Sequence, residues 1–259
     1  MIKLNGQVIE QNHFPDGTLL MKHYEEPYGS YDRIEWFYEN DAELFALICL
    51  RKHLKNRKVY LYLPYVPHAR MDRVKNKEDI FTLKYFCEVI NSLNFFEVRI
   101  LDPHSDVAPA LLNNVIVNNP NLAIKYVANS IKTDNLLYYF PDAGAAKRYS
   151  SMISAPYTYG NKVRDWETGQ IKGLTIADST LVNGKDILII DDICSRGGTF
   201  YHSAKALKTA GAKNIYLYIT HCENTILEGE LLTSGLIEKV YTTNSIFTKE
   251  HEKIEVIEL

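Results

Sequence analysis

Residues 187–221 read ILIIDDICSRGGTFYHSAKALKTAGAKNIYLYITH, and their pattern determines the fold. An apolar run at the start and another near the end predict two buried strands. A helix is expected over 199–210, ending before Gly211, a residue suited to a left-handed cap. Two strands joined by a helix pair in parallel through a right-handed crossover. The stretch therefore predicts an α/β fold.

A second strand–helix–strand unit lies nearer the N-terminus. Its strands are KVYLYLPY from Lys58 and EVRILD from Glu97, with a helix expected over 79–93. Three-and-four spacing gives that helix one apolar face, made of Ile80, Leu83, Phe86, Cys87, Ile90 and Leu93. We therefore expect an α/β protein of two similar domains, each a mostly parallel sheet flanked by helices. The expected ranges are 1–124 and 125–259, because Asn and Pro interrupt the pattern from Asn118 onward.

Composition excludes several classes of protein. A net charge of −3 and a hydrophobic fraction of 46% over 259 residues indicate neither a disordered chain nor a protein that coats nucleic acid. The sequence contains no run of roughly 18 apolar residues and no signal peptide, so we expect a soluble protein that does not enter the membrane. The four cysteines form no CxxC pair, which indicates free thiols in a reducing cytoplasm.

The most specific polar cluster follows the strand that begins at residue 187. Asp191 and Asp192 can accept hydrogen bonds from vicinal sugar hydroxyls, and the turn through Gly197, Gly198 and Thr199 offers N–H groups to an anion at a helix N-terminus. The stretch matches neither the Walker A loop nor the dinucleotide fingerprint. Its acidic pair and Gly-Gly-Thr resemble the PRPP-binding motif of type I phosphoribosyltransferases.

Two residues of the same loop raise questions. Cys194 could be a nucleophile, but only Arg196 is near in sequence to activate it, so a bystander thiol is the favoured interpretation. Arg196 itself stands where small hydroxyl residues would normally let backbone N–H groups surround a phosphate.

Another polar cluster, PYVPHARMDRV, follows the strand that begins at Lys58. It places His68, Arg70, Asp72 and Arg73 in one short loop, where two guanidinium groups could hold phosphate oxygens. The alternative is a solvated loop in which the aspartate pairs with a neighbouring arginine.

Two further clusters contain residues that suit a magnesium site. In LDPHSD, Asp102, His104 and Asp106 could bind a hard cation, although such a histidine is as often an ordinary hydrogen-bonded residue. In FPDAGAAKRY, Asp142 could hold a metal ion or its waters. A loop-to-helix turn explains this second stretch equally well.

The stretch YGNKVRDWETGQ contains a pair of cations. Lys162 and Arg164 would point the same way in an extended loop and could close over transferring phosphates. A surface loop with two charges is the alternative.

Taken in order, these five clusters resemble ribose-phosphate pyrophosphokinases (PRPP synthetases) over nearly the whole chain. The resemblance implies two phosphoribosyltransferase-like domains, the first binding ATP and the second carrying the ribose-phosphate loop and a catalytic flexible loop. It implies transfer of the diphosphoryl group of ATP to the anomeric hydroxyl of a ribose 5-phosphate, with release of AMP. It also implies Mg²⁺ as cofactor and a homo-oligomer, a dimer or a hexamer, with the ATP site shared between subunits.

The resemblance assigns roles to residues. PYVPHARMDR and HFPDGT are similar to the family's ATP-binding segments. LDPHSD and FPDAGAAKR are similar to its metal-binding segments, and NKVR to its catalytic loop. The implied ATP contacts are Phe14, Asp16, Arg70, Asp72, Arg73 and His104. The implied metal-site residues are His104 and Asp142, the catalytic residues Lys162 and Arg164, and the acceptor-binding residues Asp191, Asp192, Ser195, Arg196, Gly197, Gly198 and Thr199.

The acceptor loop departs from the family pattern DD-x-x-D-T-[AG]-G-T. Ser195 replaces an acidic residue and Arg196 replaces a threonine, which makes the loop more cationic. The acceptor could therefore carry more than a terminal monophosphate, as ADP-ribose does, giving ADP-ribose 1-pyrophosphate for NAD resynthesis. Alternatively, Arg196 grips the monophosphate of ribose 5-phosphate. Thr18 and Met71 also differ from the family, which leaves the details of adenine binding open.

Two other classes remain as alternatives. A type I phosphoribosyltransferase would use the acidic pair and the Gly-Gly-Thr turn, but it would give no role to the clusters around Arg70, Arg73 and His104. A non-catalytic PRPP synthetase-associated subunit would not need Lys162, Arg164 and His104.

Overall fold

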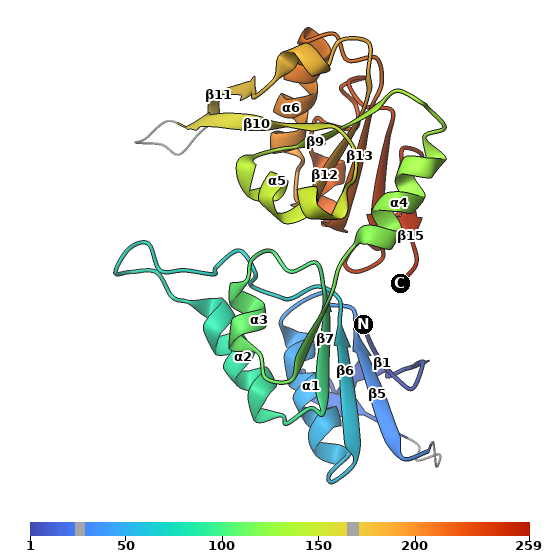
Figure 1. Ribbon diagram of the computed structural model, residues 1–259. Helices are drawn as coiled ribbons and strands as arrows, with labels where there is room; N and C mark the ends of the chain where they lie inside the picture. The colour runs from blue at the N-terminus through green and yellow to red at the C-terminus, as the bar shows by residue number, and fades with distance from the viewer. Residues whose placement is uncertain (24–28, 165–170) are drawn as a thin grey trace. The chain divides into compact units, whose positions relative to one another are not determined.

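The computed structural model describes residues 1–23, 29–164 and 171–259. The chain divides into two compact units, Met1–Asn119 (unit 1) and Pro120–Leu259 (unit 2). Both are α/β units with mostly parallel sheets flanked by helices, as the sequence predicts (Figure 1). The boundary expected between residues 124 and 125 falls within the first helix of unit 2, Asn121–Ser130 (α4).

Unit 1 is built on a six-stranded sheet with the order β2-β1-β5-β6-β7-β8. The strands from β5 to β8 are parallel, and β1 and β2 add antiparallel pairs at one edge. A separate hairpin is formed by β3 and β4. The strands are β1 Ile2–Leu4, β2 Gln7–Val8, β3 Gln11–His13, β4 Leu19–Met21, β5 Tyr31–Trp36, β6 Lys58–Leu63, β7 Glu97–Leu101 and β8 Val115–Asn118.

The helices of unit 1 are α1 Ala42–His53, α2 Thr82–Ser92 and α3 Val107–Leu111. One buried cluster joins α1 and α2 to alternate residues of β6, Val59, Leu61 and Leu63. The apolar face expected on α2 is buried from Leu83 onward. The helix begins later than predicted because the carboxylate of Asp79 accepts hydrogen bonds from two preceding backbone N–H groups in a turn. Ile80 consequently lies before the helix and is 64% exposed, so its placement on the apolar face of this helix was wrong.

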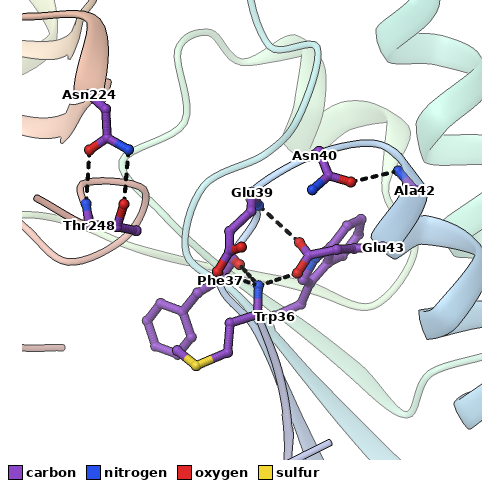
Figure 2. A network of polar contacts seen from close by, with 9 residues as sticks. Trp36, Phe37, Glu39, Asn40, Ala42, Glu43, Asn224 and Thr248 are labelled. Atoms are coloured by element: carbon purple, nitrogen blue, oxygen red, sulfur yellow. Dashed lines mark hydrogen bonds and ion pairs between the residues drawn. The ribbon is translucent and has the colours of Figure 1, made fainter. Parts of the chain in front are cut away.

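A buried carboxylate links the start of α1 to the sheet of unit 1. Glu43 accepts hydrogen bonds from the indole N–H of Trp36 and the backbone N–H of Glu39, both at 2.9 Å, and pairs with the amine of Met1 (Figure 2). A buried charge is tolerated only where such partners satisfy it. Glu43 therefore fixes α1 relative to the end of β5.

Unit 2 is built on a seven-stranded sheet with the order β11-β10-β9-β12-β13-β14-β15. All neighbours are parallel except β10 and β11, which form an antiparallel pair. The strands are β9 Leu136–Phe140, β10 Tyr157–Arg164, β11 Ile171–Ile176, β12 Asp186–Cys194, β13 Ile215–Cys222, β14 Lys239–Thr243 and β15 Ile254–Ile257.

Helices cover both faces of the sheet in unit 2. Leu188 and Ile190 of β12 pack with residues of α4 and of α5, Ala143–Tyr149. Ile187 and Ile189 pack with α6, Gly198–Thr209. Both faces of β12 are buried, which explains why its sequence is continuously apolar rather than alternating. Gly211 follows α6 with φ of 90°, the left-handed conformation that the sequence predicts there.

Among the described residues, the structure contains no helix that is long and apolar enough to cross a membrane.

Candidate functional site

In unit 1, the predicted ATP-binding loop follows β6 and the LDPHSD loop follows β7, the neighbouring parallel strand. Asp72 is buried and its carboxylate accepts hydrogen bonds from Nε and Nη2 of Arg73, at 2.7 and 3.0 Å. Those bonds, despite the opposing effect of burial, hold the pKa of Asp72 below its usual value of 3.8. The side chain of Arg73 remains 67% exposed, and Arg70 is also exposed.

The structure brings these two loops together at Asp72. A side-chain hydrogen bond with Ser105 and the nearby charge of His104 also lower the pKa of Asp72. His104 is partly buried, and Asp102 is almost fully buried with φ of 41°. Because strand ends meet at one edge of a parallel sheet, clusters distant in sequence become neighbours here.

A contact that sequence reasoning missed supports the same loop. His68 has φ of 61°, an uncommon conformation for a residue with a side chain, and its Nε2 lies 3.1 Å from Oδ1 of Asp41. The hydroxyl of Tyr38 donates to the same oxygen at 3.0 Å. Burial, followed by this bond, raises the pKa of Tyr38. These three side chains connect the loop before Arg70 to the start of α1.

The predicted adenine contacts lie on the β3–β4 hairpin. Phe14 lies in the turn between β3 and β4 and is 50% exposed. Asp16 accepts a hydrogen bond from the backbone N–H of Thr18 at 2.9 Å, and this bond lowers the pKa of Asp16 below 3.8. In the structure Asp16 stabilises the turn, a role that its sequence neighbourhood also suits.

In unit 2, the acidic pair lies at the end of β12. Burial, and then the negative charge of Asp192, raise the pKa of Asp191 well above 3.8. Asp192 is 3% exposed and forms an ion pair with Arg148, whose Nη1 lies 3.3 Å from Oδ1. Sequence reasoning gave Arg148 no role. The only signal for one was its place as the last residue of FPDAGAAKR.

Asp142 is the N-cap of α5. Its Oδ1 accepts a hydrogen bond from the backbone N–H of Ala145 at 3.0 Å, so the loop-to-helix turn considered for this stretch is present. Its charge also contributes to the raised pKa of Asp191, so these carboxylates lie in one neighbourhood. Within the described ranges, no group of three or more His, Cys, Asp or Glu side chains is arranged to hold a metal ion. Mg²⁺ usually takes one or two carboxylates together with waters and substrate phosphates, so this acidic neighbourhood fits it without a protein cage.

The acceptor loop, residues 195–199, runs into the N-terminus of α6. Gly197 is its N-cap, in the left-handed conformation with φ of 80°, which only glycine adopts readily. A Cβ on Gly197 would lie 3.0 Å from Cδ2 of Leu231, so the position is also crowded. Ser195 and Thr199 are partly buried and Gly198 is exposed. The turn therefore suits an anion bound by backbone N–H groups.

Arg196 has a partner that no local pattern indicates. Its Nη2 lies 3.0 Å from Oε2 of Glu228, and both side chains are exposed, at 73% and 58%. Glu228 lies 32 residues further along the chain, which explains why sequence reasoning missed it.

Cys194 is 1% exposed. A hydrogen bond with the thiol of Cys222, together with burial, raises the pKa of Cys194 well above its usual value. A thiol kept protonated in this way is a poor nucleophile, which supports the bystander interpretation.

The predicted catalytic pair belongs to β10, whose backbone pairs Lys162 with Leu174 and Arg164 with Ile171. The β10–β11 pair extends beyond the rest of the sheet (Figure 1). The side chains of Lys162 and Arg164 lie outside the described part of the structure. A Cβ on Gly160 would lie 2.8 Å from the carbonyl oxygen of Pro141, so glycine lets β10 pass close to the loop that carries Asp142.

Comparisons with known proteins agree with this arrangement. The phosphoribosyl transferase domain family matches residues 144–229, which include α5 except its first residue, the acidic pair and the acceptor loop. A crystal structure of phosphoribosylpyrophosphate synthetase from Mycobacterium smegmatis has a TM-score of 0.81, at 18% identity over 97% of this chain and 86% of that one. The fold and the site thus define an α/β protein with a phosphoribosyltransferase-type unit.

Curated relatives narrow the class. Ribose-phosphate pyrophosphokinase from Sulfurisphaera tokodaii is 26% identical over 84% of this chain and 75% of its own length. The enzyme of the same name from Pyrococcus abyssi is 27% identical over 96% of this chain and 88% of its own. The chain is thus similar to ribose-phosphate pyrophosphokinases over most of its length.

Proposed function

We propose that the protein is an ATP-dependent pyrophosphokinase that transfers the diphosphoryl group of ATP to the anomeric hydroxyl of a ribose 5-phosphate-type acceptor and releases AMP. The similarity to ribose-phosphate pyrophosphokinases supports this reaction class. The observation that carries the proposal is the site in unit 2, where the Asp191–Asp192 pair, Arg148 and an N–H-lined turn meet at the end of β12.

The acceptor would bind at this strand end. The carboxylate of Asp192, held by Arg148, accepts hydrogen bonds from the sugar hydroxyls. Asp191, whose raised pKa favours the protonated form, can donate as well as accept. The 5-phosphate binds to the N–H groups of Gly197, Gly198 and Thr199, with Ser195 beside them. These contacts orient the anomeric hydroxyl for attack.

ATP would bind through unit 1. Arg70 and Arg73 contact its phosphates, and Asp72 holds the guanidinium of Arg73 in place through two hydrogen bonds. His104 lies near Asp72, and Phe14 and Asp16 of the hairpin would contact the adenine of an ATP bound to a neighbouring subunit. Mg²⁺, when bound, would offset negative charge on the phosphates. His104 in unit 1 and Asp142 in unit 2 are each a candidate to hold the metal ion or its waters.

Lys162 and Arg164 would stabilise charge on the diphosphoryl group as it moves. Both residues lie on β10. The protein would act as a homo-oligomer, a dimer or a hexamer, in the cytoplasm, with the hairpin completing the ATP site of a neighbouring subunit.

Two acceptors fit the loop. Ribose 5-phosphate would give PRPP, and ADP-ribose would give ADP-ribose 1-pyrophosphate. The presence of a cation at Arg196, in place of a small hydroxyl residue, supports the larger acceptor.

The test is incubation with ATP, Mg²⁺ and each acceptor, followed by measurement of AMP and product mass. We expect AMP release that depends on acceptor, and its loss in Lys162→Ala at unchanged ATP binding. Lys125→Ala, which removes an exposed lysine of α4, is the matched control. Absence of AMP with both acceptors would refute the proposal. Consumption of PRPP with a free base would instead identify a phosphoribosyltransferase.

A further inference from the structure

One segment, residues 223–231, supports the acceptor loop along its length. The backbone N–H of Glu223 donates to the carbonyl of Cys194 at 2.8 Å. Gly229 lies against the backbone of Arg196, and Leu231 packs against Gly197. This supporting segment therefore fixes the backbone of the loop just before the helix N-terminus.

The same segment also engages the one side chain that departs most from the family pattern. Glu228 binds Nη2 of Arg196 at 3.0 Å, and the residue that follows Glu228 touches the backbone of Arg196. Side chain and backbone of Arg196 are thus both held by two consecutive residues. The carboxylate of Glu228 therefore orients the guanidinium.

We propose that Glu228 is a positioning residue that selects the acceptor, an inference that rests on the proposed function. Its carboxylate keeps the guanidinium of Arg196 away from a terminal monophosphate, which the N–H groups of the turn bind by themselves. It presents the guanidinium to a second phosphate on the acceptor. The preferred acceptor is therefore a ribose whose 5-phosphate forms part of a diphosphate bridge.

The geometry of arginine explains the selection. A guanidinium has five N–H donors in a rigid fork, and Glu228 uses a donor on Nη2. Donors on the other nitrogens remain for a second phosphate, so a diphosphate can bind without breaking the ion pair. A monophosphate bound in the turn could contact the guanidinium of Arg196 only by displacing Glu228.

The test measures binding directly by calorimetry, with ribose 5-phosphate and ADP-ribose as separate probes. Because the ion pair is exposed, its removal should change the dissociation constant of an affected acceptor by about two- to five-fold. In Glu228→Gln we expect ribose 5-phosphate to bind more tightly by this factor, and the affinity for ADP-ribose to increase less. The ratio of the two affinities, which favours ADP-ribose in the wild-type protein, should therefore become smaller. Glu228→Asp, which keeps the charge, should restore the wild-type preference.

Two controls separate positioning from a general effect. Glu230→Gln removes the same charge from an exposed residue of the same segment and should leave the preference unchanged. In an Arg196→Thr background, Glu228→Gln should have no further effect, because Glu228 acts through Arg196.

The inference is overturned if Glu228→Gln shifts both affinities equally, if it behaves like Glu230→Gln, or if its effect persists without Arg196. Binding needs no turnover, so acceptor binding without AMP release would refute the proposed reaction while the affinities still decide the role of Glu228. If neither acceptor binds to the wild-type protein, both proposals fail.

Discussion

Replacing Gly229 with alanine should disable the acceptor loop while leaving the protein folded. Gly229 has φ of −94° and ψ of 170°, an extended conformation open to any residue, so only space requires glycine there. A Cβ would overlap the carbonyl oxygen of Arg196 and lie 2.9 Å from its carbonyl carbon. Carbon atoms pack best at about 3.5–4.0 Å, so one of the two backbones must move by roughly 1 Å.

A displacement of that size has different consequences for activity and for stability. Misplacing a reacting group by about 1 Å can cost about 100-fold in rate. Overpacking costs typically about 1–3 kcal/mol of folding free energy, a fraction of the roughly 5–15 kcal/mol of a typical domain. We therefore expect Gly229→Ala to fold, to lose about 100-fold in kcat/KM for the acceptor and to keep its affinity for ATP.

The assay combines AMP release at varied acceptor concentration, ATP binding and urea unfolding. Glu230→Ala is the matched control, because it adds no atoms beside the loop and lies at an exposed position of the same segment. Wild-type acceptor kinetics in a folded Gly229→Ala protein would show that the loop geometry does not govern acceptor use.

Three further predictions concern buried or strained groups. The pKa of Asp191 is raised in the folded state, so the contribution of Asp191 to the stability of the protein falls as pH rises above 3.8. Asp191→Asn should therefore raise the melting temperature at pH 7 but not at pH 3. The same variant should weaken acceptor binding about tenfold or more. Glu43→Gln should lower the free energy of unfolding by about 1–3 kcal/mol, measured in urea, whereas half-exposed Glu39→Gln should change it by less than about 1 kcal/mol. Asp41→Ala should weaken ATP binding about two- to five-fold, measured by calorimetry, because it removes the oxygen that holds His68. Unchanged affinity would show that this contact has no part in ATP binding.

The sequence predicted the architecture of both units because apolar periodicity is local in the chain. The strand–helix–strand pattern around residues 187–221 and its left-handed Gly211 are present in the structure. The start of α2 was misplaced because Asp79, which suits a first helical turn, instead closes a turn with preceding N–H groups. Periodicity alone does not distinguish these two uses of an aspartate.

The candidate site was predicted cluster by cluster, but its internal pairings were not. The partner of Arg196 lies 32 residues away, and that of Asp192 lies on another helix. Spacing in sequence carries no signal for such contacts, because the sheet topology and not the local pattern brings them together. Local reasoning did anticipate that Asp72 could pair with a neighbouring arginine, since that contact joins adjacent residues.

These pairings bear on how the candidate sites of the two units, each taken separately, would bind phosphates. Arg73, Arg148 and Arg196 each contact a carboxylate, on Asp72, Asp192 and Glu228 respectively. An arginine side chain has about 2 kcal/mol of rotamer entropy, and a guanidinium already held in place loses less of it on binding. Each carboxylate also reduces the positive charge that a phosphate meets, so the pairs lower nonspecific attraction while keeping the donors oriented. Under the proposed function, an acceptor or nucleotide would therefore be selected by whether its oxygens reach the donors that the carboxylates leave available, so geometry would count for more than net charge.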